Sequence, residues 1–169
     1  MSKKEQSHQV YHSEHAAAEL VKGLRFIFPQ DNVAAEARLL YQQAPITCNV
    51  IVAGLPYSGV AVHGTYSGPE VLTFIPGYIH APQENQSTRV SSGDVGFLRF
   101  QGGTHLLPGN KVTSEIAWFY EAGACPSMED GPIPLNIFAR FEGSEWEQFA
   151  ESCKSIPPGQ SKPLKIVAA

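Results

Sequence analysis

Short segments in which apolar and polar residues alternate, separated by turns rich in glycine and proline, run through most of this 169-residue chain. Alternation with a period of two is typical of β-strands that bury one face. The chain contains 15 glycines and 13 prolines, an excess that works against long helices. This pattern therefore excludes a helical bundle or coiled coil and favours a fold built from many short strands.

The strand candidates can be placed from their turns. Two alternating runs, 24–28 and 33–39, flank a turn at 29–32 and predict a β-hairpin. Further candidates follow at 59–66, 70–75, 94–100, 113–121 and 134–141, and the tail 162–169 is expected to add an edge strand or to stay loose. The longest irregular connection, 76–91, is a place where function often lies. The pattern predicts a mainly β fold, a closed or nearly closed β-barrel.

Two short helices interrupt these strands. Pro45 suits the first turn of one helix, Gly54 ends it, and its packed face is expected to carry Ile46, Val50 and Ala53. For the second helix, Ser144 followed by Glu147 predicts a capping box. Its apolar stripe consists of Trp146, Phe149, Ala150 and Cys153.

Composition bounds the class of protein. A net charge of -4 and a pI near 5.8 argue against nucleic acid as a partner, and no apolar run is long enough to cross a membrane. Residues 1–22 are polar, without the apolar stretch of a signal peptide, and predict an N-terminal arm that is partly helical or mobile. Residues 23–169 then form a single barrel domain. Three widely spaced cysteines, Cys48, Cys125 and Cys153, predict reduced thiols in a cytoplasmic protein.

Several motifs resemble those of a known family. The segment 44–47 before the first helix resembles the start of the first cyclophilin helix, and Val62-His63 resembles part of the phenylalanine-histidine-arginine run on a cyclophilin strand. The order of motifs is similar to a bacterial cyclophilin-like family known only as domain of unknown function 3830. The motifs are Leu55-Pro56, His63, Tyr66-Ser67-Gly68, Glu70, Glu84-Asn85, Gly93-Asp94-Val95, Trp118-Phe119-Tyr120 and the run from Asn136 to Arg140.

This resemblance covers roughly residues 24–142 and implies a closed eight-stranded cyclophilin-like β-barrel whose ends are closed by helices. The chain departs from true cyclophilins at Gly64, which stands where they place the arginine that polarises the prolyl amide. Without that guanidinium, the resemblance supports the fold rather than prolyl isomerase activity.

Six side chains are candidates for a site at the barrel mouth. His63 and Glu70 are the candidate catalytic residues, because an imidazole and a carboxyl can exchange protons with a ligand. The candidate ligand-binding residues are Tyr66, Asn85, Trp118 and Tyr120. Each also has a simpler structural interpretation: a hydrogen-bonded histidine, polar turn or loop residues, and aromatic core packing. Glu115 faces away from Trp118 along its strand, and needs water or a partner such as Arg99 or Arg140.

Three functions remain open. The favoured hypothesis is that the protein binds or transforms a polar small metabolite at a pocket in the barrel mouth, with acid–base catalysis by His63, helped by Glu70 or Tyr66. The alternatives are a non-catalytic subunit that forms homo-oligomers or binds another protein, and a divergent peptidyl-prolyl isomerase. The sequence leaves open whether the protein is an enzyme. No cofactor is expected, and no metal site, because His63, His80 and His105 lack the spacing of a zinc motif.

Overall fold

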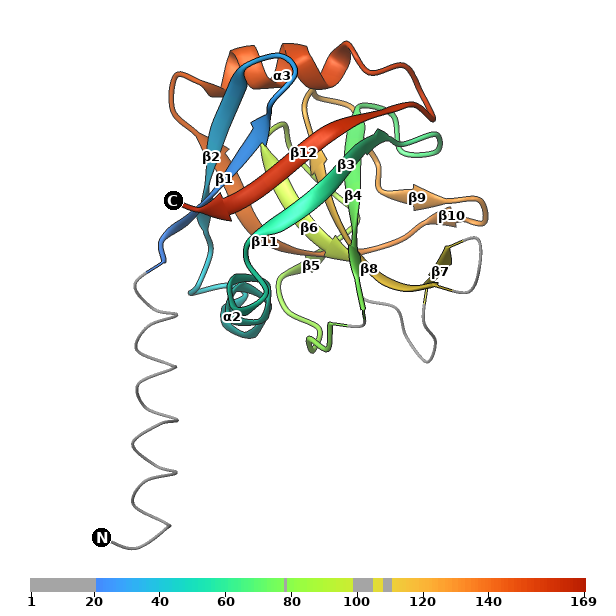
Figure 1. Ribbon diagram of the computed structural model, residues 1–169. Coiled ribbons are helices and arrows are strands. Elements are labelled where there is room, and N and C mark those ends of the chain that lie inside the picture. The colour runs from blue at the N-terminus through green and yellow to red at the C-terminus, as the bar shows by residue number, and fades with distance from the viewer. Residues whose placement is uncertain (1–20, 78, 99–104, 108–110) are drawn as a thin grey trace, which may run out of the picture.

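The computed structural model describes residues 21–77, 79–98, 105–107 and 111–169. They form a closed antiparallel β-barrel of eight strands with two helices (Figure 1). The barrel strands are β1 (Gly23–Phe28), β2 (Val33–Leu39), β3 (Tyr57–His63), β4 (Glu70–Pro76), β6 (Asp94–Leu98), β8 (Lys111–Phe119), β11 (Leu135–Glu142) and β12 (Ser161–Ala168). The helices are α2 (Pro45–Ala53) and α3 (Trp146–Lys154). The prediction of a closed eight-stranded barrel with two helices is confirmed.

The strands follow one another around the barrel in the order β2-β1-β12-β3-β4-β8-β6-β11, and β11 pairs with β2 to close it. Three short strands lie outside this ring: β5 (Gln86–Ser87) pairs with β11, β7 (His105–Leu107) pairs with β8, and β9 (Ser127–Met128) pairs with β10 (Gly131–Pro132). The β9–β10 hairpin projects from the side of the barrel (Figure 1). Within the described residues, no helix is long and apolar enough to cross a bilayer.

The C-terminal segment forms a full strand of the barrel, β12. The tail 162–169 is predicted to be an edge strand or to stay loose. That prediction is wrong, because β12 is part of the barrel wall and lies between β1 and β3. Pro163 is tolerated there because it pairs with β3 alone, opposite Val60, while the pairing with β1 begins only at Lys165. The predicted N-terminal arm lies almost wholly outside the described residues, which begin at Val21.

The strand ends also differ from the prediction. β3 ends at His63 rather than at residue 66, because the backbone N–H of Gly64 already bonds to the Glu70 carbonyl and closes a turn. β8 ends at Phe119, because the N–H of Tyr120 bonds to the Pro69 carbonyl instead of continuing the ladder. The turn from Gly64 to Pro69 is therefore fixed at both ends by main-chain hydrogen bonds.

The helices close the two ends of the barrel (Figure 1). The bounds of α2 are as predicted, but its packed face is predicted only in part. Val50 packs against the core, whereas Ile46 is 47% exposed and Ala53 is also exposed. The buried residues are Thr47, Cys48 and Ile51. The capping box predicted for α3 is also wrong. The helix begins after Glu145 without a side-chain cap, and the Glu145 carboxylate accepts hydrogen bonds from Arg25 on β1.

The barrel interior is filled by an aromatic core. Phe26, Trp118, Phe141 and Phe149 are packed there, with the Phe26 and Trp118 rings 5.2 Å apart in an edge-to-face arrangement. The stripe on α3 places Phe149 and Cys153 in this core, as predicted. Burial raises the pKa of the Cys153 thiol to about 12, which keeps it protonated and unreactive.

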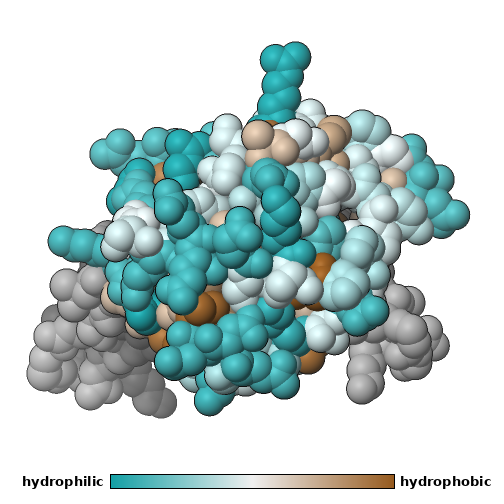
Figure 2. Space-filling model, turned by 90° about the horizontal axis from the view of Figure 1, so that it is seen from above, coloured by the Kyte–Doolittle hydropathy of each residue, from teal (hydrophilic) through white to brown (hydrophobic). Residues whose placement is uncertain are grey.

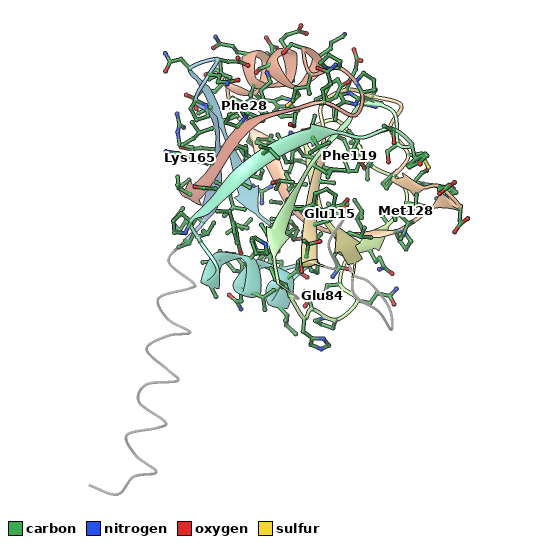
Figure 3. The ribbon with its side chains drawn as sticks, turned by 45° about the vertical axis from the view of Figure 1, so that its right-hand side comes forward. Phe28, Glu84, Glu115, Phe119, Met128 and Lys165 are labelled. Atoms are coloured by element: carbon green, nitrogen blue, oxygen red, sulfur yellow. The ribbon has the colours of Figure 1, made fainter. Side chains whose placement is uncertain are left out.

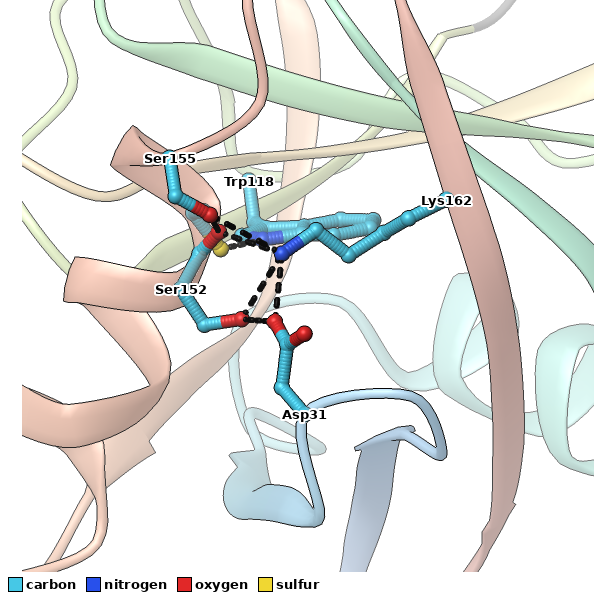
Figure 4. A network of polar contacts seen from close by, with 6 residues as sticks. Asp31, Trp118, Ser152, Ser155 and Lys162 are labelled. Carbon is cyan, nitrogen blue, oxygen red and sulfur yellow. Dashed lines mark hydrogen bonds and ion pairs between the residues drawn. The ribbon is translucent and has the colours of Figure 1, made fainter.

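A polar cluster fastens α3 to the barrel end (Figure 4). The Lys162 ammonium on β12 donates to the Asp31 carboxylate at 2.5 Å, to the Ser152 carbonyl at 2.8 Å and to the Ser155 hydroxyl at 3.1 Å. Ser152 also donates to Asp31. These hydrogen bonds, first that of Lys162, lower the pKa of Asp31. Because every polar group in the cluster has a partner, it is a structural clamp rather than a binding site.

Candidate functional site

The candidate site lies on the outer surface of the barrel wall. Side chains alternate along β8, so that Ile116 and Trp118 face the barrel interior while Glu115, Ala117 and Phe119 face outward. The outward residues are still buried, because the segment with the β9–β10 hairpin packs over them through Met128 and other apolar side chains. Figure 3 shows Glu115 and Phe119 on the barrel wall and Met128 on the hairpin. A second, smaller core is thus formed outside the barrel.

A cavity of about 250 Å³ remains between this wall and the hairpin. Its wall is mostly apolar and includes Leu72 and Phe74 of β4, Leu98 of β6, and Met128 and Ile133 of the hairpin segment. Its titratable side chains are His63, Tyr66, Glu70 and Glu115. A mostly apolar cavity with a few convergent polar groups is the usual form of a small-molecule site. We call this cavity the outer-wall pocket.

Glu70 begins β4 at one end of the outer-wall pocket and is only 5% exposed. Its carboxyl occupies the space beside Gly64: a Cβ added at Gly64 would lie 2.6 Å from the Glu70 Oε1 atom. Burial raises the pKa of Glu70 to about 7, and a hydrogen bond with the Ser67 side chain partly opposes that effect. Glu70 therefore exists in both protonation states near neutral pH.

Glu115 is the second carboxyl in the outer-wall pocket, and it is 7% exposed. Burial, with the nearby negative charge of Glu70, raises its pKa to about 8. Within the described part of the chain it has no hydrogen-bond or ion-pair partner. Arg140, one expected partner, instead binds Asp94 at 2.6 Å, and the other, Arg99, lies outside the described residues.

His63 contributes to the pocket wall, but both of its ring nitrogens are engaged. Nδ1 lies 2.7 Å from the Gly64 carbonyl oxygen, and Nε2 lies 2.7 Å from the Tyr120 hydroxyl. Because a carbonyl can only accept, Nδ1 carries the proton, and Nε2 accepts from the tyrosine when the ring is neutral. The structure brings His63 and Tyr120 together as predicted, in a contact that favours the structural interpretation of both.

Two other predicted site residues, Tyr66 and Trp118, lie in different places: one lines the outer-wall pocket and the other is in the barrel interior. Tyr66 lines the outer-wall pocket and is 60% exposed, as a residue at the rim should be. Trp118 is fully buried in the barrel interior, and its indole N–H donates to the Cys153 sulfur at 3.2 Å. Strand alternation turns its ring away from the pocket, so the structure does not place Trp118 where a ligand in that pocket could stack on it.

The predicted loop residues belong to another part of the molecule. The Glu84 carboxylate accepts the backbone N–H groups of Ile46 and Thr47 at 3.1 and 2.8 Å and so caps α2 (Figure 3 labels Glu84 beside this helix). Asn85, with a positive φ of 42°, donates to the Ile137 carbonyl at 2.8 Å. Asn85 does not line the outer-wall pocket, and this loop supports the fold at α2.

Sequence reasoning treated Glu115 only as a side chain in need of a partner, and did not place it in the site. A signal was present, because Glu115 alternates with Ala117 and Phe119 on one face of its strand. A carboxyl that shares a strand face with an alanine and a phenylalanine is expected to be at least partly covered. The cover, however, comes from a hairpin more than ten residues further along the chain, which local pattern does not reveal.

Comparison with known proteins identifies the family. Residues 26–167 match the family model described as "Protein of unknown function (DUF3830)". The chain belongs to the DUF3830 family. Because this match covers most of the barrel, the outer-wall pocket and the aromatic core both lie within the DUF3830 region. Among curated proteins, no sequence matches this member significantly.

Two solved structures resemble this DUF3830 protein. The first is described as the structure of McbB in complex with tryptophan, with 15% identity and a TM-score of 0.61, covering 86% of this chain. The chain spans only 44% of the McbB chain. The second is the solution structure of a hypothetical protein from Archaeoglobus fulgidus, with 21% identity and a TM-score of 0.54, covering 89% of this chain and 96% of that one. At these identities the likeness shows a shared fold.

Proposed function

We propose that the protein binds a small molecule in the outer-wall pocket and exchanges a proton with it through Glu70. The observation that carries this proposal is a pair of buried carboxyls, Glu70 and Glu115, in an otherwise mostly apolar cavity of about 250 Å³. Burying two carboxyls costs stability unless a partner satisfies them. A cavity that keeps such a pair is a functional candidate, because perturbed carboxyls in pockets mark sites of acid–base chemistry.

Glu70 suits proton transfer better than His63. A general acid or base works best when its pKa lies near the operating pH, and burial brings that of Glu70 to about 7. Glu115, with a pKa raised to about 8, is mostly protonated at neutral pH while the pocket is empty, so it can donate a hydrogen bond to a ligand or ionise when a cation binds. His63 holds the turn beside Glu70 through its bonds to Gly64 and Tyr120. Its proposed role is therefore to position rather than to react.

The NMR signal of the Met128 methyl group tests binding in the outer-wall pocket. The chain has two methionines, and Met128 lines the outer-wall pocket. In protein labelled with ¹³C at the methionine methyls, we expect fragments that enter the pocket to shift the Met128 signal. Leu72→Phe narrows the pocket and should weaken those shifts, whereas Val60→Phe, on the exposed outer side of β3, should leave them unchanged.

Two results would contradict the proposal. One is a fragment library of several hundred compounds, spanning acids, amides, alcohols and amines, that leaves the Met128 signal unmoved. The other is a set of shifts that persists unchanged in Leu72→Phe, which would place the binding elsewhere. The Glu70→Gln variant then separates binding from proton transfer, because it keeps the shape of the side chain and removes the titrating group.

The likeness to a bacterial cyclophilin-like family is proposed for the fold, and not for prolyl isomerase activity. Gly64 stands where cyclophilins have their arginine, and the Glu70 carboxyl fills the adjacent space. A carboxyl there offers a proline ring nitrogen no fixed positive charge. We therefore expect no acceleration of prolyl isomerisation in a proline-containing reporter peptide, and turnover at the level of a true cyclophilin would contradict this.

The oligomer alternative has less support. The end of the barrel at α3 is mostly hydrophilic, with hydrophobic residues visible only in small separate patches (Figure 2). Stable homodimers usually bury a broad and mostly apolar face.

We propose a cytoplasmic small-molecule binding protein, because the buried thiols Cys48 and Cys153 suit a reducing compartment.

A further inference from the structure

The outer-wall pocket has acidic groups but no basic one. Among the described residues that line it, Glu70 and Glu115 carry carboxyls, and none is a lysine or an arginine. His63 and Tyr66 are its other titratable groups, and the Nδ1 proton of His63 already points to the Gly64 carbonyl. The pocket thus presents two carboxyls to one small space without a fixed cation among these residues.

The buried carboxyl of Asp94, in another part of the protein, has both a cationic partner and a backbone partner. Asp94, 4% exposed, is bound by Arg140 at 2.6 Å and also accepts the backbone N–H of Ser91. Glu115 is buried almost as deeply, lines the cavity and has no partner within the described part of the chain. A buried carboxyl without a partner costs stability, and a bound cation is the group that would relieve that cost.

We propose that the ligand of the outer-wall pocket carries a primary ammonium group on a small apolar body, with the ammonium between Glu70 and Glu115 and the body against Leu72, Met128 and Ile133. This inference rests on the proposed function and adds the chemical class of the ligand. An ammonium has three N–H donors, enough to serve both carboxyls at once. A hard metal ion would need more oxygen ligands than this pair supplies.

The size of the cavity limits the apolar body. About 250 Å³ corresponds to roughly eight waters at about 30 Å³ each, and so to a molecule of roughly eight to ten heavy atoms. An aromatic or branched aliphatic amine of that size fits. The methionine at the wall, Met128, is half-buried, and its flexible thioether can adapt to either shape.

Binding of such an amine must move a proton. The free pocket holds Glu115 mostly as the neutral acid at pH 7, while a primary amine is already a cation in solution. The cation favours the carboxylate form, so the Glu115 O–H bond breaks and its proton passes to the solvent as the ion pair forms. No electrons are transferred and no covalent bond to the ligand forms. Net proton release therefore distinguishes this mode of binding from simple apolar burial.

Calorimetric titration with two matched probes tests the inference. The probes are 2-phenylethylamine and 2-phenylethanol, which differ in the ammonium and hydroxyl groups alone. At pH 7 we expect the amine to bind wild-type protein at least about tenfold more tightly than the alcohol. Titrations in two buffers of different ionisation enthalpy should show that the amine, and not the alcohol, releases about one to one and a half protons on binding, most of it from Glu115 and the rest from the partly protonated Glu70.

Two variants give the controls. Glu115→Gln keeps the size of the side chain and removes a buried acid, so it should fold; we expect it to lose most of the preference for the amine and to release only the part of a proton that Glu70 still holds at pH 7. Glu121→Gln removes an exposed carboxylate that pairs with Lys154, and should behave like wild type. An amine preference and a proton release that are as large in Glu115→Gln as in the wild-type protein would overturn the assignment.

The remaining outcomes separate this inference from the proposed function. If amine and alcohol bind equally, and both are weakened by Leu72→Phe, the pocket binds small molecules and the ammonium class is wrong. If neither probe binds wild-type protein, the ammonium class is also wrong at this size. The pocket itself is then judged by the Met128 fragment screen, which uses neutral and acidic fragments as well.

Discussion

Strand β8 has two faces that bury their side chains in different surroundings. Toward the barrel interior, Ile116 and Trp118 join an aromatic core in which the only polar atom of the tryptophan has a partner, the Cys153 sulfur. Toward the β9–β10 hairpin, Ala117 and Phe119 join a smaller core that also holds Glu115 and a cavity. The same strand thus supplies a filled region that stabilises the fold and an incompletely filled one that is available to a ligand.

The difference shows where this barrel can accommodate a site. A closed eight-stranded barrel is just wide enough for side chains to fill its interior, and the aromatic rings fill it here. The outer wall is constrained less, because a single hairpin covers it. We therefore expect substitutions in the interior to change stability most, and substitutions in the outer-wall pocket to change pH dependence and binding.

The largest expected effect lies in the interior. Trp118→Ala removes a fully buried indole from the aromatic core and should lower the free energy of unfolding by about 3–5 kcal/mol. Met128→Ala, on the half-buried hairpin, should lower it by less than about 2 kcal/mol. Urea unfolding followed by circular dichroism measures both. Equal losses would contradict the distinction between the two regions.

In the outer-wall pocket, by contrast, a substitution is expected to raise the free energy of unfolding. The folded pKa of Glu115, about 8, lies above its ordinary value of 4.5, so the folded state holds a proton that the unfolded state has released between these pH values. Wild-type stability should therefore fall as the pH rises from 4.5 through 8. Glu115→Gln removes this loss and should be more stable than wild type by about 2–4 kcal/mol at pH 8.5.

Thermal and urea unfolding of both proteins at pH 5 and pH 8.5 measures that difference. At pH 5 the difference should shrink to less than about 1 kcal/mol, because this pH lies only half a unit above the ordinary pKa of 4.5. Glu121→Gln, on the surface, should match wild type at both pH values within about 0.5 kcal/mol. A Glu115→Gln variant less stable than wild type at pH 8.5 would contradict the account.

A smaller loss is expected at the clamp below α3. Lys162→Met keeps an unbranched apolar side chain but removes the ammonium, which binds Asp31 and lies 4.8 Å from the centre of the Phe28 ring, and should cost about 1–3 kcal/mol at pH 7. The folded pKa of Asp31 is lowered, so its contribution is present at neutral pH and is lost as the pH falls through that pKa. The variant should therefore approach wild type in acid, and a constant difference from pH 7 to pH 2 would contradict this.

The smallest expected effect is at α2. Glu84→Ala removes the carboxylate that accepts the N–H groups of Ile46 and Thr47, and should cost about 1 kcal/mol. Glu84→Gln keeps an acceptor oxygen and should cost less. Because this loop does not line the outer-wall pocket, neither variant should alter fragment shifts at Met128. A change in those shifts would show that the loop is coupled to the outer-wall pocket, and would contradict the assignment of Glu84 to a purely structural role at α2.

Local pattern predicted the barrel well. Alternation located the strands, Pro45 and Gly54 bounded α2, and the apolar stripe placed Phe149 and Cys153 of α3 in the core. The errors arose where distant residues decide the outcome. β12 is paired on both sides because β1 and β3 lie apart in the barrel and both bond to it. The capping box predicted at Ser144 and Glu147 does not form, and α3 begins after Glu145, whose carboxylate binds Arg25, 120 residues away in sequence.

The site was predicted less completely for the same reason. Glu70 and Tyr66, which flank the predicted turn, line the outer-wall pocket. His63 contacts Tyr120, which the pattern places on one strand face with Trp118. Trp118 and Asn85 lie elsewhere, because strand alternation sends one inward and a main-chain hydrogen bond holds the other. Sequence alone could not show which outward residues the hairpin covers, and so did not assign Glu115 to the site.

The most direct test of the account is a ¹³C NMR titration of the glutamate side-chain carboxyls from pH 4 to pH 9, with Glu70→Gln and Glu115→Gln to assign the signals. The account predicts two carboxyls with midpoints near 7 and 8, and a lower midpoint for Glu115 once the charge of Glu70 is removed. If every glutamate instead titrates near its ordinary value of 4.5, the two carboxyls are solvated, and the outer-wall pocket is not the site proposed here.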